Sequence, residues 1–107
     1  MRSTFKIDLA HPAPIAARLA QRAGDSVAGW RPTGPLHWKV GTIASWKNVG
    51  KVAVEVTPKG EHASTLTFEI KRLGLVDPFG MDKNDYRDFY NKLEPLVRAE
   101  TAKGQQV

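Results

Sequence analysis

The chain has 107 residues, of which 41% are hydrophobic and 25% are charged, and these proportions predict one globular domain rather than a disordered segment. Its 16 Lys and Arg residues outnumber its 11 Asp and Glu residues, and a net charge of +5 attracts nucleic acid, anionic membrane surfaces or acidic proteins. The lack of cysteine excludes disulfides, thiolate metal sites and thiol catalysis. Together with the lack of a long apolar run, it leads us to expect a cytoplasmic protein without signal peptide or membrane span.

The first third of the chain predicts a strand, a helix and a loop. Residues 3–9 alternate between apolar and polar side chains, which is typical of a strand with one buried face. Residues 13–23 are rich in alanine, follow Pro12 and precede Gly24, and therefore predict a helix that packs closely on a sheet. Residues 24–36 contain several glycines and prolines and predict a long loop.

The middle of the chain predicts three further strands. They comprise residues 36–46, 51–57 and 64–73, each with side chains that alternate between an inward and an outward face. The turns between them, at residues 48–50 and 58–61, are short enough to join antiparallel neighbours. We therefore expect an antiparallel meander with one dry face.

The last third predicts an amphipathic helix. Asp82 is a suitable N-cap, and Asp85 three residues later gives a weaker form of the capping box. Pro95 is expected to kink the helix or end its regular part, and residues 99–107 to form a polar tail that frays. The apolar positions that repeat at helical spacing are Tyr86, Phe89, Tyr90, Leu93, Leu96 and Val97.

This order of elements predicts an α+β fold, in which a strand, a helix, a three-stranded antiparallel meander and a helix follow one another and the helices pack on one face of a small sheet. Residues 3–98 are expected to form this single domain. The order loosely resembles a shortened helix-grip domain, of the kind that cups lipids or other apolar ligands, although full-length members have more strands between the helices. The resemblance concerns topology alone and implies no residue roles.

Residues 30–51 combine tryptophans and basic residues and contain no Asp or Glu. Trp38 falls on the predicted dry face and is expected in the core. Trp30 falls in the predicted loop, where a plug of the core and a stacking platform for a nucleobase both remain open. Trp46 lies beside a turn, where edge packing and partial exposure both remain open.

The lysines of this stretch point away from the valine face or sit at a turn. The outer sheet face also carries Asp8, Glu55 and Glu69, and mixed signs on neighbouring strands predict solvated cross-strand pairs rather than a nucleic-acid site centred on the sheet. We therefore prefer the end of the molecule formed by the loop and the hairpin as the basic patch. The candidate residues for binding nucleic acid or another polyanion are Trp30, Arg31, His37, Lys39, Trp46, Lys47 and Lys51.

The sequence offers no catalytic or metal-binding motif. Residues 41–51 lack the glycine spacing and the Ser or Thr of a phosphate loop. Residues 82–93 lack the glycine and the glutamate of a calcium loop, and the histidines at 11, 37 and 62 lack metal-ligand spacing. No nucleophile, base and orienting residue can be placed together, so we expect a protein that is not an enzyme and needs no cofactor or metal.

Three functions remain open. A basic module that binds nucleic acid or another polyanion ranks first. A protein-interaction domain, which includes the case of a homodimer, ranks second because a single sheet leaves an edge uncovered. The third is a cup for a small apolar ligand between the C-terminal helix and the sheet, for which plain core packing is the simpler interpretation, lined by Trp38, Phe68, Phe89 and Tyr90.

Overall fold

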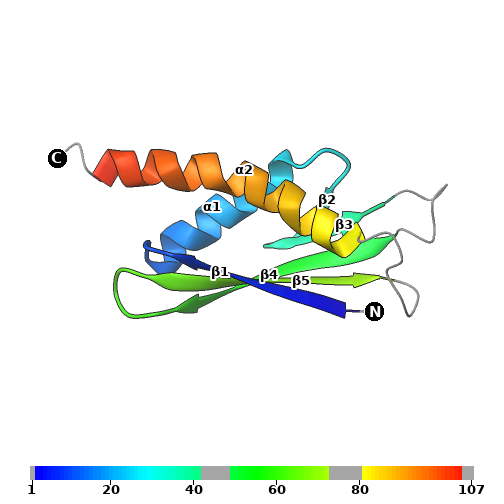
Figure 1. The fold of residues 1–107 in the computed structure, drawn as a ribbon, viewed down its shortest axis with the longest axis horizontal. Helices are drawn as coiled ribbons and strands as arrows, with labels where there is room; N and C mark the ends of the chain where they lie inside the picture. Colours follow the sequence, from blue (N-terminus) through cyan, green and yellow to red (C-terminus); the bar gives the residue numbers. More distant parts are fainter. Residues whose placement is uncertain (1, 42–48, 73–80, 105–107) are drawn as a thin grey trace.

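The computed structural model describes residues 2–41, 49–72 and 81–104. Within these residues, two helices cover one face of a five-stranded antiparallel sheet, whose strand order is β1-β5-β4-β3-β2 (Figure 1). This confirms the α+β class and the placement of both helices on one face. In chain order the strands are β1 (Arg2–Leu9), β2 (Arg31–Gly34), β3 (His37–Val40), β4 (Gly50–Pro58) and β5 (Ser64–Arg72).

The N-terminal strand lies at one edge of the sheet and pairs only with β5 among the described strands. Their register sets Phe5 opposite Phe68, and β5 continues the register to β4, where Phe68 faces Val54. These three side chains point to the helix side, since alternate residues of a strand face opposite sides of a sheet. β1, β5 and β4 are the long strands of the sheet, with β1 at its edge.

A short strand, β2, occupies part of the predicted loop, so the prediction of a loop over residues 24–36 was wrong there. β2 pairs with β3 through a hairpin that is irregular between Pro32 and Gly34. Leu36 adopts a positive φ of 57° in the connection, and its backbone N–H donates to the side-chain oxygen of Gln21 at 2.8 Å. The carbonyl of Leu36 accepts from Val54 N–H at 3.0 Å. Tertiary hydrogen bonds thus order a segment that its turn-forming residues predict to be irregular.

The first helix, α1 (Ala13–Ser26), extends three residues beyond the predicted end at residue 23. Gly24 therefore lies inside the helix, where it allows a close approach to the sheet. A Cβ at this position would lie 2.1 Å from the indole of Trp38, which is shorter than any real contact of this kind. The same indole donates from Nε1 to a carboxylate oxygen of Asp25 at 2.9 Å. Packing against Trp38 thus outweighs the tendency of glycine to end a helix.

The core contains a cluster of aromatic rings between the sheet and the second helix. Trp30 stacks on Phe89 with ring centroids 6.2 Å apart, and Trp38 lies 5.9 Å from Trp30. Phe68 lies 5.2 Å from Phe89. Trp38, Phe68 and Phe89 are fully buried, whereas Tyr90 is 39% exposed. These rings fill the space that an apolar ligand would need. Three of the four residues that could line a ligand cup, Trp38, Phe68 and Phe89, therefore belong to the core.

The second helix, α2 (Met81–Gly104), includes Asp82 in its first turn rather than at the cap that the sequence suggests. Asp82 is 2% exposed, and its carboxylate accepts from Arg72 Nε and from Ser3 Oγ, both at 2.6 Å. Arg72 also forms an ion pair with Asp85. The acidic residues at the start of α2 therefore bind the end of β5, because a buried arginine requires compensating carboxylates.

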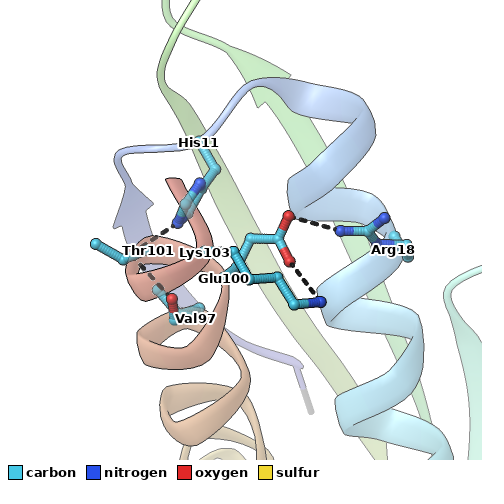
Figure 2. A network of polar contacts seen from close by, with 6 residues as sticks. All are labelled: His11, Arg18, Val97, Glu100, Thr101 and Lys103. Carbon is cyan, nitrogen blue, oxygen red and sulfur yellow. Dashed lines mark hydrogen bonds and ion pairs between the residues drawn. The ribbon is translucent and has the colours of Figure 1, made fainter. Parts of the chain in front are cut away.

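The helix α2 continues through Pro95 to Gly104, so the prediction of a frayed tail was wrong for residues 99–104. Contacts with α1 and with His11, which precedes α1, hold residues 99–104 in place (Figure 2). Glu100 accepts from Arg18 at 2.8 Å, and His11 Nε2 lies 3.0 Å from Thr101 Oγ1. No helix in the described ranges is both long and apolar enough to cross a membrane.

Candidate functional site

A row of five basic side chains crosses the outer face of the sheet, opposite the helices. The register pairs Arg2 of β1 with Lys71 of β5, and Lys71 with Lys51 of β4. It pairs Lys51 with Lys39 of β3, and Lys39 with Arg31 of β2. All five residues are exposed. We call them the basic row, which includes one cation from every described strand and starts at Arg2, the first residue of β1.

The basic row concentrates positive charge over a short distance. Directly opposite residues of an antiparallel pair have Cβ atoms about 4.5–5.5 Å apart, and like charges at this spacing are destabilising. Neighbouring strands lie about 4.8 Å apart, so the five positions span roughly 19 Å across the sheet. Cross-strand pairing on most sheet surfaces favours opposite charges. Four consecutive like-charged pairs are therefore difficult to explain by stability alone.

The two halves of the basic row differ in their partners. Glu69 Oε1 lies 3.6 Å from Arg2 Nε and 3.6 Å from Lys71 Nζ, so a carboxylate partly compensates the half on β1 and β5. Within the part of the chain that the structure describes, no ion pair joins a carboxylate to a basic residue of the row on β4, β3 or β2. The strongest uncompensated positive charge therefore lies on Lys51, Lys39 and Arg31.

The acidic residues of the outer face lie in the rows next to the basic row. Glu69 and His37 flank Ala53 two residues further along the strands, and Glu55 lies opposite Thr67 in the row after that. Because the side chain of Ala53 is small, the face has a depression of about 330 Å³ there. Its walls are formed by His37, Ala53, Val54, Glu55, Thr67 and Glu69.

The opposite end of the same face has complementary partners. Asp8 accepts from Thr65 Oγ1 at 2.8 Å and from Lys59 Nζ at 3.0 Å. The hydrogen bond from Thr65 and the charge of Lys59 hold the pKa of the Asp8 carboxyl below its ordinary value of 3.8. The charge of Asp8 therefore has partners within the protein.

The structure brings three of the predicted site residues together and places Trp30 away from them, in the core. Arg31, Lys39 and Lys51 all belong to the basic row, and His37 is exposed in the adjacent row. Trp30 is only 9% exposed and packs in the aromatic cluster, so it plugs the core and presents no free face for a base. Trp46 and Lys47 lie outside the described residues.

Two residues of the basic row, Arg2 and Lys71, were missed by sequence reasoning. Both lie on strands that the sequence correctly indicates, with their side chains on the polar face. The missing information is the pairing of β1 with β5, which sets Arg2 opposite Lys71 although the two residues are far apart in sequence. With that pairing, the alternation of each strand is sufficient to align the row.

The described residues contain no cluster of three or more histidine or acidic side chains that could hold a metal ion. The buried polar cluster of Arg72, Asp82 and Asp85 links a strand to a helix on the inner face. This cluster fixes the start of α2. It is buried on the inner face, so the candidate site is the outer face.

Comparison with known proteins supports the fold. No protein-family model and no curated protein matches the chain. Among solved structures, the chain is similar to a conserved protein from Geobacillus kaustophilus, with 14% sequence identity and a TM-score of 0.53. The match covers 92% of this chain and 96% of that one. At this identity the similarity shows the shared fold alone.

Proposed function

We propose that this protein is a non-catalytic module that binds nucleic acid or another polyanion through the basic row. The alignment of five exposed cations in register across five strands supports this proposal most strongly. Like-charged neighbours destabilise the free protein, whereas a bound phosphate chain neutralises them and releases its counterions. The polyanion thus gains binding energy at the place where the free protein has unfavourable contacts.

The composition of the outer face favours contacts to phosphates over contacts to bases. Among the described residues of this face, the one aromatic side chain is His37, whose Nδ1 donates to the Pro35 carbonyl at 2.7 Å. Trp30 and Trp38 are buried. Contacts to phosphates fix position without reading sequence. We therefore propose sequence-independent binding, and we propose the cytoplasm as the compartment because a chain without cysteine needs no oxidising environment to fold.

Fluorescence anisotropy with labelled single- and double-stranded oligonucleotides tests the proposal. Each phosphate neutralised on a single strand contributes about −0.7 to the slope of log affinity against log salt, so five contacts predict a slope of about −3.5. Affinity should then fall roughly 100-fold between 50 and 200 mM salt. Absence of binding at 50 mM salt, or binding that does not respond to salt, would overturn the proposal.

A pair of matched double variants locates the contacts. Lys39→Gln with Lys51→Gln removes two charges from the uncompensated half of the basic row. Lys83→Gln with Lys92→Gln removes the same charge from exposed positions on α2, in the layer opposite the outer face. The first variant should lose at least 10-fold in affinity at 50 mM salt, and the second should lose less than 3-fold. Equal losses would show that net charge, rather than the row, attracts the oligonucleotide.

A further inference from the structure

The two edges of the sheet differ in their ability to pair with another chain. The edge strand β2 has four residues, contains Pro32 and is irregular, features that protect an edge from further pairing. The other edge strand, β1, has eight residues with neither proline nor glycine, and among the described strands it pairs only with β5. Within the described residues, one side of the β1 backbone is therefore available for hydrogen bonds to another strand.

We propose that two copies of this chain pair through their β1 strands, antiparallel and centred on Phe5, to form a continuous ten-stranded sheet. A two-fold axis perpendicular to the sheet gives each copy the same neighbour and keeps the outer faces of both copies on one side. In such a pair, outward side chains meet outward side chains and inward ones meet inward ones.

The charges of β1 select this register. With Phe5 opposite its own counterpart, Arg2 of one copy faces Asp8 of the other, and Thr4 faces Lys6. Centring the pair on Thr4 would set Arg2 against Lys6, and centring it on Lys6 would set two lysines opposite each other. Both arrangements oppose like charges, which is unfavourable.

Among registers that pair five or more residues of β1, the one centred on Ile7 is the remaining competitor. It also places opposite charges together, with Lys6 facing Asp8, but it pairs only residues 5–9. The register centred on Phe5 pairs residues 2–8 and therefore forms more backbone hydrogen bonds. The longer pairing is the one that we propose.

An aromatic strip beside β1 is suited to contact with the second copy. Tyr86 of α2 stacks on Phe5 with ring centroids 4.4 Å apart, and Tyr90 follows one turn later, 6.2 Å from Tyr86. Tyr90 is the large hydrophobic side chain that stands out as exposed among the described residues, at 39%. A second copy at the β1 edge would bring its own strip alongside and reduce the exposure of apolar surface.

This dimer has a consequence that rests on the proposed function. Because both outer faces point the same way, the dimer carries two basic rows on one face. Arg2 of each copy lies opposite Asp8 of the other, so the rows are offset along the strands by six residues, or about 20 Å. One polyanion that contacts both rows would bind with the added strength of a bivalent contact.

Sedimentation of the full chain without nucleic acid tests the dimer separately from polyanion binding. We expect the mass to rise from 11.8 kDa towards twice that value between 1 and 500 µM protein. Arg2→Asp should weaken the dimer at least 10-fold by opposing two carboxylates, and adding Asp8→Arg to it should restore association. Lys6→Glu should weaken the dimer much less than Arg2→Asp, whereas the register centred on Ile7 predicts the reverse. A monomer at every concentration, or a dimer insensitive to Arg2→Asp, would overturn the proposal.

Cross-linking provides a second measurement that does not depend on charge. The chain has no cysteine, so single cysteines can be introduced without side reactions. A mixture of Thr4→Cys and Lys6→Cys chains should form a mixed disulfide in greater yield than either chain alone, because these positions face each other across the two-fold axis. The Lys39→Gln, Lys51→Gln protein should dimerise normally while it loses polyanion binding, so failure of one proposal is distinguishable from failure of the other.

Discussion

The two ends of the outer sheet face are built from the same strands but have opposite electrostatic character. Where β1 ends, Asp8 accepts hydrogen bonds from Thr65 and Lys59. Where β1 begins, Arg2 faces Lys71 at the first of four successive like-charged pairs. Since the same strands carry complementary partners at one end, sheet formation does not require like charges to meet at the other. The proposed binding of an external anion would account for like charges at one end only.

Reversing the charge in the basic row should have the largest effect on oligonucleotide affinity. Lys39→Glu with Lys51→Glu places two carboxylates in the middle of the row, so phosphate contacts become repulsive. We expect at least a 100-fold loss of oligonucleotide affinity at 50 mM salt, measured by anisotropy. Lys83→Glu with Lys92→Glu on α2 makes the same change in net charge and should weaken binding far less. Comparable losses in both variants would remove the distinction between the row and the rest of the surface.

Single substitutions that neutralise one cation should affect polyanion binding differently in the two halves of the basic row. Lys39→Gln removes a cation without a carboxylate partner among the described residues, and the salt slope should become shallower by about 0.7 on single strands. Lys71→Gln removes a cation that shares Glu69 with Arg2, so its effect on the slope should be smaller. Salt titrations of both variants against the same oligonucleotide measure the difference. A larger effect for Lys71→Gln would contradict the charge distribution described above.

The basic row should also reduce the stability of the free protein. Lys51 lies between Lys39 and Lys71 in the register, so Lys51→Thr removes two like-charged contacts and places a good strand former on the sheet. We expect the free energy of unfolding in urea to rise by about 0.2–1 kcal/mol at low salt, the range measured for cross-strand pairs. The gain should shrink in 1 M salt, where the Debye length is about 3 Å. A loss of stability at low salt would show that the row is not under repulsion.

The strands and both helices could be predicted largely from sequence because their side-chain periodicity reports local burial. Phe68 and Val54 fall on the inner face that alternation predicts. The strand β2 could not be predicted, because Pro32 and Gly34 have turn propensities, and the hairpin is ordered by tertiary hydrogen bonds of Leu36 to Gln21 and Val54. Tertiary contacts of this kind leave no periodic pattern in the sequence.

The part of α2 beyond Pro95 could also not be predicted from local sequence. Its last turns are polar in sequence and predict fraying. The structure holds them through Glu100, which contacts Arg18 of α1, and through Thr101, which contacts His11 (Figure 2). The partners in each pair are separated by more than 80 residues, so their proximity follows from the packing of α2 across α1.

The candidate site was partly predictable for a related reason. Arg31, Lys39 and Lys51 are close enough in sequence for a hairpin to bring them together, and the sequence indicates them. Arg2 and Lys71 join the row only through the pairing of the first and last strands, which alternation does not specify. The register of β4 and β5 places Glu55 two rows away from the basic row, whereas Glu69, in the adjacent row, contacts Arg2 and Lys71.

Substitution of Asp8, at the other end of the outer face, should have the smallest effect on stability and the clearest dependence on pH. Asp8→Asn removes the charge that Thr65 and Lys59 stabilise. Because the pKa of Asp8 is lowered in the folded protein, its stabilising contribution is fully present above the ordinary value of 3.8 and is lost as pH falls below it towards the folded value. Urea unfolding of the two proteins should therefore give a constant difference from pH 7 to pH 5 and a shrinking one below about pH 4. A difference that grows on acidification would mean that the Asp8 contacts favour the protonated carboxyl, and the two ends of the face would then be equally unsatisfied.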